Sequence, residues 1–275
     1  MQKTKQNKSI SYILIRVFIV ALCAAMLALD YIPIQYVQDG VRNVWISTIV
    51  QQCVGAIAII LLMLHLNIKL FGKIHAWLYL LPCLIVALDN FPLISYVNGN
   101  MHFTRTGAWD FVLFALYCLA IGLFEECVFR GVLFSVIASL FSQDKKGFFK
   151  TFVVSSAVFG LAHLFNLLSG AGIGATLLQV CYTTLTGGLF AFAMIKTKNV
   201  LCAAFVHGLY NFCGLLLSEQ GLGSGIVFDV GTGVMMGIIS VIIGVFVLYS
   251  VWKYTEAERS VLYKHLGIEK HKAQE

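Results

Sequence analysis

The stretch FEECVFRGVLF, which begins at Phe124, places three charged side chains inside a long apolar run. An ionisable residue at the centre of a membrane span costs about 3 kcal/mol unless it is paired or hydrated, so it indicates a functional site. Glu126 and Arg130 are four residues apart, in the order that favours an ion pair on one helix face. Glu125 points about 100° away around the helix. We therefore expect Glu125 to be an unpaired carboxylate that is free to act as a general base.

Two further motifs place histidines in apolar segments. FGLAH ends at His163, one helical turn after Phe159, and HGLYN places His207 and Asn211 one turn apart. A single histidine in a span usually packs through one hydrogen bond. Two histidines, an asparagine and an unpaired carboxylate on three apolar segments carry more hydrogen-bonding capacity than packing requires.

These residue types predict hydrolysis of an amide by either of two mechanisms. In the first, Glu125 takes a proton from a water that His163 holds, and His207 and Asn211 donate hydrogen bonds to the oxyanion. In the second, Glu125, His163 and His207 bind Zn²⁺ with one open coordination position. The sequence leaves both open, so the expected cofactor is either none or zinc. It contains no HExxH motif, which excludes a standard zincin.

The composition indicates a membrane protein. Of the 275 residues, 59% are hydrophobic and only 12% are charged, against about a quarter charged in a soluble domain. The net charge of +6 does not indicate a nucleic-acid partner, because the basic residues fall in short loops and tails. The eight cysteines lie in apolar segments without a CxxC pair, so we interpret them as buried hydrophobic residues.

A membrane span needs about 20 apolar residues, and this criterion predicts an all-α, polytopic integral membrane protein of about eight transmembrane helices. The predicted spans are Tyr12–Leu29, Val44–Leu66, Ala76–Tyr96, Ala108–Phe124 continuing towards Phe141, Phe148–Leu168, Ala175–Ile195, Val200–Leu217 and Thr232–Trp252. Lysines and arginines concentrate in alternate loops, which predicts that the N- and C-termini are both cytoplasmic. The first span is expected to remain as an anchor, because no small-residue cleavage site follows it.

Four smaller features carry their own expectations. The two glycines of TLTGGLF, Gly187 and Gly188, predict close helix packing. Asp89 and Asn90, just before Pro92, are expected to be interfacial capping residues. The loop SEQGLGSGIVFD is expected to be mobile, and the charged tail after Trp252 is expected to form an amphipathic helix on the membrane surface.

The three motifs, EECVFR, FGLAH and HGLYN, in this order on three spans, resemble the EExxxR, FxxxH and HxxxN motifs of the CPBP intramembrane proteases. This family is also called the CAAX protease and bacteriocin-processing (ABI) family. The resemblance divides the chain into 1–107, three helices without a motif; 108–217, a CPBP/CAAX protease core of four helices; and 218–275, a last helix and a cytoplasmic tail.

The resemblance implies a role for each motif residue. Glu125 activates the water together with His163, and Glu126 with Arg130 forms a supporting ion pair. His207 and Asn211 stabilise the oxyanion. The family was called metalloproteases, and a metal-free glutamate mechanism is the rival.

The implied function is an intramembrane endopeptidase that cuts near the cytoplasmic side of the membrane. The expected substrate is a CAAX-like prenylated C-terminus or a membrane-associated, bacteriocin-type peptide. Helix rise places Glu125 and His207 in the cytoplasmic half of the bilayer, whereas His163 comes out deeper. The expected partners are a peptide or protein substrate in the membrane and the lipid bilayer, with no nucleic acid. The short, lysine-rich chain favours a bacterial cell membrane, and the oligomeric state stays open.

Two other functions are weighed against the protease. One is a non-catalytic or dual-role regulator or immunity protein that binds a membrane sensor kinase or a bacteriocin. The other is a proton-coupled transporter that uses Glu125 and the histidines as a relay. The transporter is disfavoured because such proteins usually contain inverted repeats, and we find none in this sequence.

Overall fold

The computed structural model describes residues 2–28, 32, 34–225 and 230–268, and the side chains of 2–14 and 232 lie outside this description. The chain divides into two compact units, Met1–Ile34 and Gln35–Glu275. The first unit holds one long helix, α1 (Gln2–Ala28). The second unit holds all three motifs.

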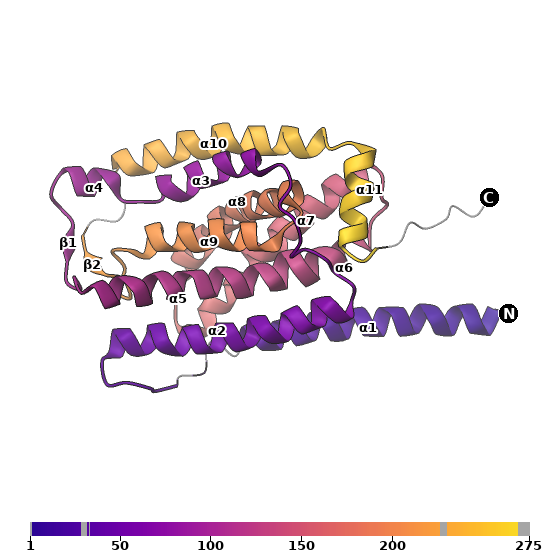
Figure 1. The fold of residues 1–275 in the computed structure, drawn as a ribbon, viewed down its shortest axis with the longest axis horizontal. Coiled ribbons are helices and arrows are strands. Elements are labelled where there is room, and N and C mark those ends of the chain that lie inside the picture. Colours follow the sequence, from indigo (N-terminus) through magenta and orange to yellow (C-terminus); the bar gives the residue numbers. More distant parts are fainter. Residues whose placement is uncertain (1, 29–31, 33, 226–229, 269–275) are drawn as a thin grey trace. The chain divides into compact units, whose positions relative to one another are not determined.

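The second unit is built almost entirely from helices (Figure 1). In chain order its elements are α2 (Gly40–His65), η2 (Trp77–Tyr79), α3 (Leu80–Asp89), α4 (Leu93–Val97), β1 (His102–Phe103), α5 (Ala108–Glu126), η3 (Cys127–Leu133), α6 (Phe134–Ala138), α7 (Lys145–Ala162), η4 (His163–Ser169), α8 (Ile173–Thr197), α9 (Val200–Leu215), β2 (Gly223–Ser224), α10 (Val230–Trp252) and α11 (Glu256–His265).

The helices confirm an all-α, multi-pass membrane protein. Among the described residues, five helical segments are long and apolar enough to span a bilayer: 40–65, 108–138, 145–169, 173–197 and 233–252. Three shorter apolar helices, 15–28, 77–89 and 200–215, coincide with the other three predicted spans. Length and composition thus define five spans, and the number eight stays a prediction.

The predicted span Ala76–Tyr96 is not one continuous helix, so this prediction was wrong. α3 ends at Asp89, and α4 begins again after Pro92. Proline has no N–H to continue a helix and disfavours the helical conformation of the residue before it. Asn90 is also more than an interfacial cap, because its buried side chain donates a hydrogen bond to the carbonyl of Tyr210 on α9 at 2.9 Å.

The described part of the loop SEQGLGSGIVFD is packed against the unit, contrary to the expectation of a mobile loop. β2 pairs with β1 in an antiparallel ladder, and Leu222 is fully buried. The carbonyl of Gln220 accepts a hydrogen bond from Trp45 Nε1 at 2.7 Å, and its side chain accepts one from Tyr117. Residues 226–229 lie outside the described residues.

The charged tail forms the expected helix, α11. Thr255 and Glu258 form a capping box at its start. Its apolar face is buried, with Leu262 and Tyr263 inside, and Ser135 donates a hydrogen bond to the carbonyl of Leu266 at 2.7 Å. α11 lies across the end of the helices opposite β1 and β2 (Figure 1). Its contact with a membrane surface stays a prediction.

Candidate active site

The EECVFR motif lies where an α-helix changes its winding. α5 ends at Glu126, and the next seven residues, Cys127–Leu133, form a π-helical segment before α6 continues the helix. All seven residues of this segment are buried. π-Helical turns are rare and occur often at functional sites. The local widening begins directly after the two glutamates and contains Arg130.

Glu126 joins Arg130 to a histidine on another helix. Arg130 Nη1 donates to Glu126 Oε1 at 3.1 Å, so the ion pair expected from the i, i+4 spacing is present. His207 Nδ1 on α9 lies 2.9 Å from the same oxygen. Both side chains of the ion pair are fully buried, and His207 is 6% exposed at its side chain. The carboxylate thus balances one guanidinium charge and orients one imidazole ring.

Arg130 is held from two other directions. Its Nη2 donates to the carbonyl of Gly187 on α8 at 2.7 Å, and its guanidinium carbon lies 4.2 Å from the ring centroid of Phe159. Such a cation–π contact is worth about 2 kcal/mol when it is desolvated. A Cβ at Gly187 would lie 2.9 Å from Phe159 Cδ1 and 3.2 Å from Arg130 Nη2. Gly187 is therefore the residue that lets α8 approach the arginine.

Aromatic rings fix the plane of His207. Phe190 stacks on the imidazole with centroids 4.4 Å apart and an interplanar angle of 15°, and Phe159 meets it edge-on at 5.7 Å. Because the Glu126 carboxylate only accepts, Nδ1 of His207 carries the proton of their hydrogen bond. The other nitrogen, Nε2, accepts in the neutral ring and donates only in the imidazolium. An oxyanion-binding role for His207 therefore requires the imidazolium.

His163 also packs against Phe159. It begins the 3₁₀ segment η4, and its ring centroid is 5.3 Å from that of Phe159. Its Nδ1 lies 3.1 Å from the Phe159 carbonyl, so Nδ1 donates and Nε2 is left as an acceptor. The ring of Phe159 thus packs against the rings of both histidines. The deeper position of His163 in the membrane stays a prediction.

Glu125 and Asn211 complete the motif set without joining the buried network. Both are half-buried, and within the described part of the chain neither side chain makes a hydrogen bond. The structure therefore brings Glu126, Arg130 and His207 together. Within the described residues, no hydrogen bond or ion pair joins Glu125, His163 or Asn211 to these three side chains.

The zinc alternative requires Glu125, His163 and His207 to converge on one ion. Over the residues that the structure describes, no group of three or more His, Cys, Asp or Glu side chains is arranged to hold a metal ion. Nδ1 of His207 is already engaged by Glu126, and that of His163 by a carbonyl. These contacts leave Nε2 of both rings open, and metal-binding histidines are usually held through their other nitrogen in this way. The zinc alternative therefore stays a prediction.

Two glycines that the sequence analysis did not single out set the distance between α5 and α9. A Cβ at Gly122 would lie 2.6 Å from the Ala204 carbonyl oxygen, and one at Gly208 would lie 2.8 Å from Leu119 Cδ2. Gly122 is one turn before Glu126, and Gly208 follows His207 directly. The closest approach of the two helices therefore lies beside the Glu126–His207 bond. The glycine inside HGLYN was the only sequence signal of this contact.

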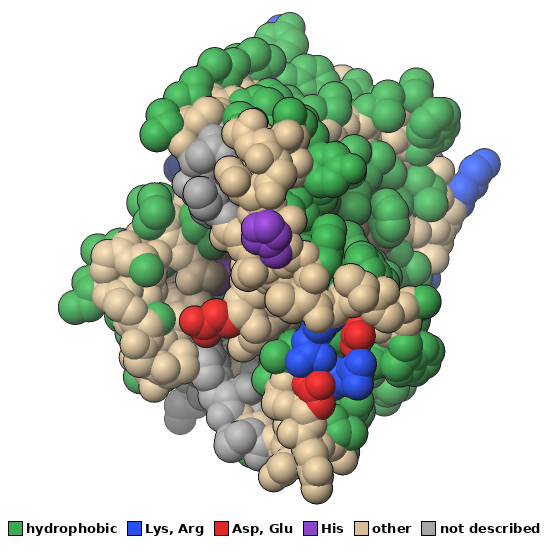
Figure 2. Space-filling model, turned by 90° about the vertical axis from the view of Figure 1, so that its left-hand side faces the viewer, with side chains coloured by type: hydrophobic (Ala, Val, Ile, Leu, Met, Phe, Trp, Pro, Cys, Tyr) green, Lys and Arg blue, Asp and Glu red, His purple; other side chains and the backbone are tan. Residues whose placement is uncertain are grey.

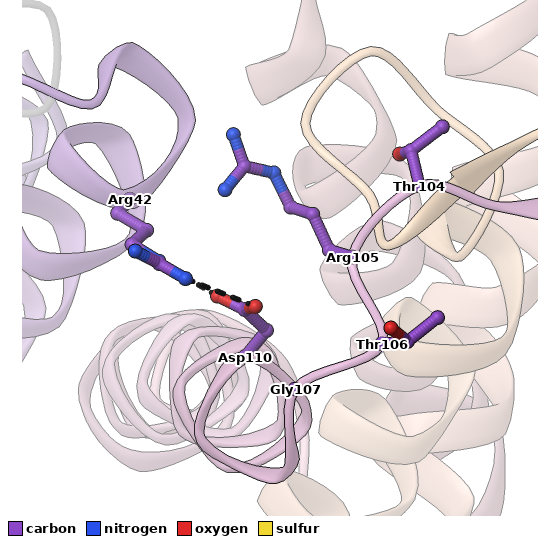
Figure 3. A pocket seen from close by; sticks show the side chains of 6 residues that line it. All are labelled: Arg42, Thr104, Arg105, Thr106, Gly107 and Asp110. Atoms are coloured by element: carbon purple, nitrogen blue, oxygen red, sulfur yellow. Dashed lines mark hydrogen bonds and ion pairs between the residues drawn. The ribbon is translucent and has the colours of Figure 1, made fainter.

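A second polar cluster lies at the β1–β2 end, where Figure 2 shows acidic and basic side chains gathered on one face. Arg42 pairs with Asp110 through two hydrogen bonds of 2.7 and 3.1 Å, beside a pocket of about 540 Å³ (Figure 3). Arg105 pairs with Asp39 at 3.0 and 2.9 Å and holds the pKa of Asp39 at about 2. Each carboxylate is engaged by an arginine, so this cluster ties the start of α2 to the start of α5 and offers no general base.

Comparison with known proteins agrees with the motifs. Residues 107–213 match the family model described as type II CAAX prenyl endopeptidase Rce1-like. This match covers less than half of the 275-residue chain, and we call residues 107–213 the Rce1-like region. The Rce1-like region contains all six motif residues, from Glu125 to Asn211.

The chain is also similar to a distant relative whose name gives the same class of protein. The protein named CAAX prenyl protease 2 of Saccharomyces cerevisiae is 29% identical over 100 residues, which cover 33% of this chain. The match covers 32% of the relative, so the chain aligns with about a third of the length of that protein. No solved structure matches the chain.

Proposed function

We propose that this protein is an intramembrane endopeptidase that hydrolyses a peptide bond near the cytoplasmic side of the membrane. The observation that carries the proposal is the buried Glu126–Arg130–His207 network inside the Rce1-like region. Next to it lies a half-buried Glu125 that makes no side-chain hydrogen bond to any residue that the structure describes. A charge network of this kind is expensive to bury, because each ion loses several kcal/mol of hydration. Because this network is built around His207, we infer that it serves catalysis.

In the proposed reaction, the Glu125 carboxylate takes one proton from a water as the water oxygen bonds to the substrate carbonyl carbon. Nε2 of His163 accepts a hydrogen bond from the same water and orients it. The carbonyl oxygen becomes an oxyanion, which accepts hydrogen bonds from the Asn211 amide and from the His207 imidazolium. Glu126 accepts the Nδ1 hydrogen bond of that imidazolium while it stays paired with Arg130.

The tetrahedral intermediate then breaks its carbon–nitrogen bond. The proton held by Glu125 passes to the leaving nitrogen, so the products are a new carboxyl group and a new amine. Glu126, Arg130, Gly187 and Phe159 do not touch the substrate in this scheme. They hold His207 in place, which is the positioning that a rigid site requires.

We propose as substrate a CAAX-like prenylated C-terminus or a membrane-associated, bacteriocin-type peptide. The name of the yeast relative favours the prenylated C-terminus. We place the protein in a bacterial cell membrane, on the strength of its short length and lysine-rich loops.

The test is peptide cleavage by purified protein in proteoliposomes. The panel holds a farnesylated CAAX peptide, the same peptide without the farnesyl group, and bacteriocin-like leader peptides. Wild type, Glu125→Ala and His207→Ala are each assayed with and without a chelator. The proposal predicts cleavage by wild type only, unchanged by the chelator. Loss with chelator and recovery with zinc would favour the metal mechanism.

A protein that cleaves none of these peptides, and whose Glu125→Ala variant still fulfils its cellular role, would contradict the protease. That result would favour a regulator or immunity protein that binds a membrane partner.

A further inference from the structure

A second cavity lies on the opposite side of α8 from the arginine network. It has a volume of about 260 Å³, and its walls come from α3, α7, α8 and α10. Gly188 lines this cavity, whereas its neighbour Gly187 accepts the hydrogen bond of Arg130. The backbone of α8 therefore separates the cavity from the proposed active site.

The wall of this cavity is apolar and electrically neutral. It contains no charged side chain, and three of its four hydroxyl groups donate back to carbonyls of their own helix. These are Ser156 to Phe152 at 2.8 Å, Thr184 to Val180 at 2.7 Å and Thr186 to Thr183 at 3.4 Å. An apolar cavity of about 150 Å³ in a protein stays free of water and binds hydrocarbons. The uncharged, mostly apolar lining of this cavity therefore favours a hydrocarbon ligand.

The cavity opens onto a surface of the same apolar kind. Val153, Leu185 and Leu248 belong to its lining and are 45%, 71% and 46% exposed. They lie on α7, α8 and α10, all three of which are long and apolar enough to span a bilayer. The molecules that surround such a surface in the membrane are lipids, and their acyl chains are continuous with the mouth of the cavity.

We propose that this cavity binds an acyl chain of a membrane phospholipid. The acyl chain inserts between α10 and the α7–α8 pair. There it makes dispersion contacts with side chains that would have no partner atoms across an empty gap. Phe152 and Ser156 line the cavity two turns and one turn, respectively, before Phe159 of the arginine network. The bound chain therefore supports the face of α7 that carries the proposed active site. The proposal does not depend on peptidase activity.

The chain offers a matched pair of substitutions on one helix. Gly244 lines the cavity, and a Cβ added there meets no atom within 4 Å, so Gly244→Phe is the substitution chosen to place a ring in this space. A Cβ at Gly237 on α10 also meets nothing within 4 Å, but Gly237 does not line the cavity. Gly237→Phe is therefore the control for adding a phenyl ring to this helix.

The experiment uses full-length protein in vesicles that contain a phosphatidylcholine with a photoreactive diazirine in its acyl chain. After irradiation, the labelled peptides of α7, α8 and α10 are identified by mass spectrometry. We expect wild type and Gly237→Phe to be labelled at cavity residues such as Ile243 and Val247, and Gly244→Phe to lose that labelling while it keeps the labelling of exposed residues. Thermal unfolding in detergent provides the check on folding.

Two results would overturn the proposal. The first is equal labelling of Ile243 and Val247 in wild type and Gly244→Phe, because the ring then does not compete with the lipid. The second is labelling that a photoreactive farnesyl peptide produces and the phosphatidylcholine does not, because the cavity would then hold an isoprenoid chain.

Discussion

Glu126 on α5 and His207 on α9 are 81 residues apart in sequence, and a 2.9 Å contact joins Oε1 of the first to Nδ1 of the second. The same oxygen accepts from Arg130. This three-residue contact ties the first motif of the chain to the last. Because Glu126 is engaged by both Arg130 and His207, we propose its neighbour Glu125 as the carboxylate that activates the water.

Removing Glu126 is expected to destabilise the whole protein. Glu126→Ala leaves the fully buried guanidinium of Arg130 without its counter-charge, which costs about 3–5 kcal/mol. The double variant Glu126→Leu/Arg130→Met removes both charges and is expected to recover most of that loss. Thermal unfolding in detergent measures both variants. A double variant as unstable as Glu126→Ala would show that the charges are not the cause.

The two neighbouring glycines of α8 are expected to respond differently to alanine. Gly187→Ala pushes a methyl group against Phe159 and Arg130, and overpacking of this kind costs about 1–3 kcal/mol. A Cβ at Gly188 has its nearest neighbours at 3.4 Å, so Gly188→Ala should be tolerated. Peptide cleavage and thermal unfolding are measured for both. Equal effects at the two positions would argue against a special role for Gly187.

The contact between α5 and α9 is expected to control the Glu126–His207 bond. Gly208→Ala forces Leu119 away and widens the gap beside His207, so it should reduce cleavage and lower stability by about 1–3 kcal/mol. Gly237→Ala on α10, where a Cβ meets nothing within 4 Å, is the control. A Gly208→Ala protein with full activity would contradict the role given to this crossing.

The sequence predicts those contacts of the site whose two residues lie close together along the chain, and it misses those between distant segments. The ion pair of Glu126 with Arg130 follows from a spacing of four residues. Its bond to His207 joins two different helices, and no local pattern in the sequence encodes it. The π-helical turn after Glu126 likewise has no sequence signal that we could identify.

The same limit applies to the elements. Eight apolar runs were visible from hydropathy, and all eight contain helices, yet the break at Pro92 was missed because the apolar pattern continues across it. Gly187 was correctly associated with close packing, but only the structure identifies what it packs against. Phe190, which stacks on His207, is one of 21 phenylalanines in the sequence, and nothing in its neighbourhood distinguishes it from the others.

The ion pair at the β1–β2 end is expected to make stability depend on acid pH. Arg105 lowers the pKa of Asp39 from 3.8 to about 2 in the folded protein. The stabilisation is therefore fully present above the unfolded value of 3.8 and is lost as the pH falls from there through about 2. Melting temperatures across this range should fall more steeply for wild type than for Asp39→Asn. Parallel curves for the two proteins would contradict the assignment.

The central claim is that Glu125, and not Glu126, activates the water. The most direct measurement is the cleavage rate of a farnesylated CAAX peptide by Glu125→Gln in proteoliposomes, with its melting temperature taken beside that of wild type. Loss of a general base costs roughly 10²–10⁴-fold in rate. We predict a loss of this size with an unchanged melting temperature, because Glu125 makes no hydrogen bond within the described residues. A Glu125→Gln protein that cleaves at close to the wild-type rate would contradict the account.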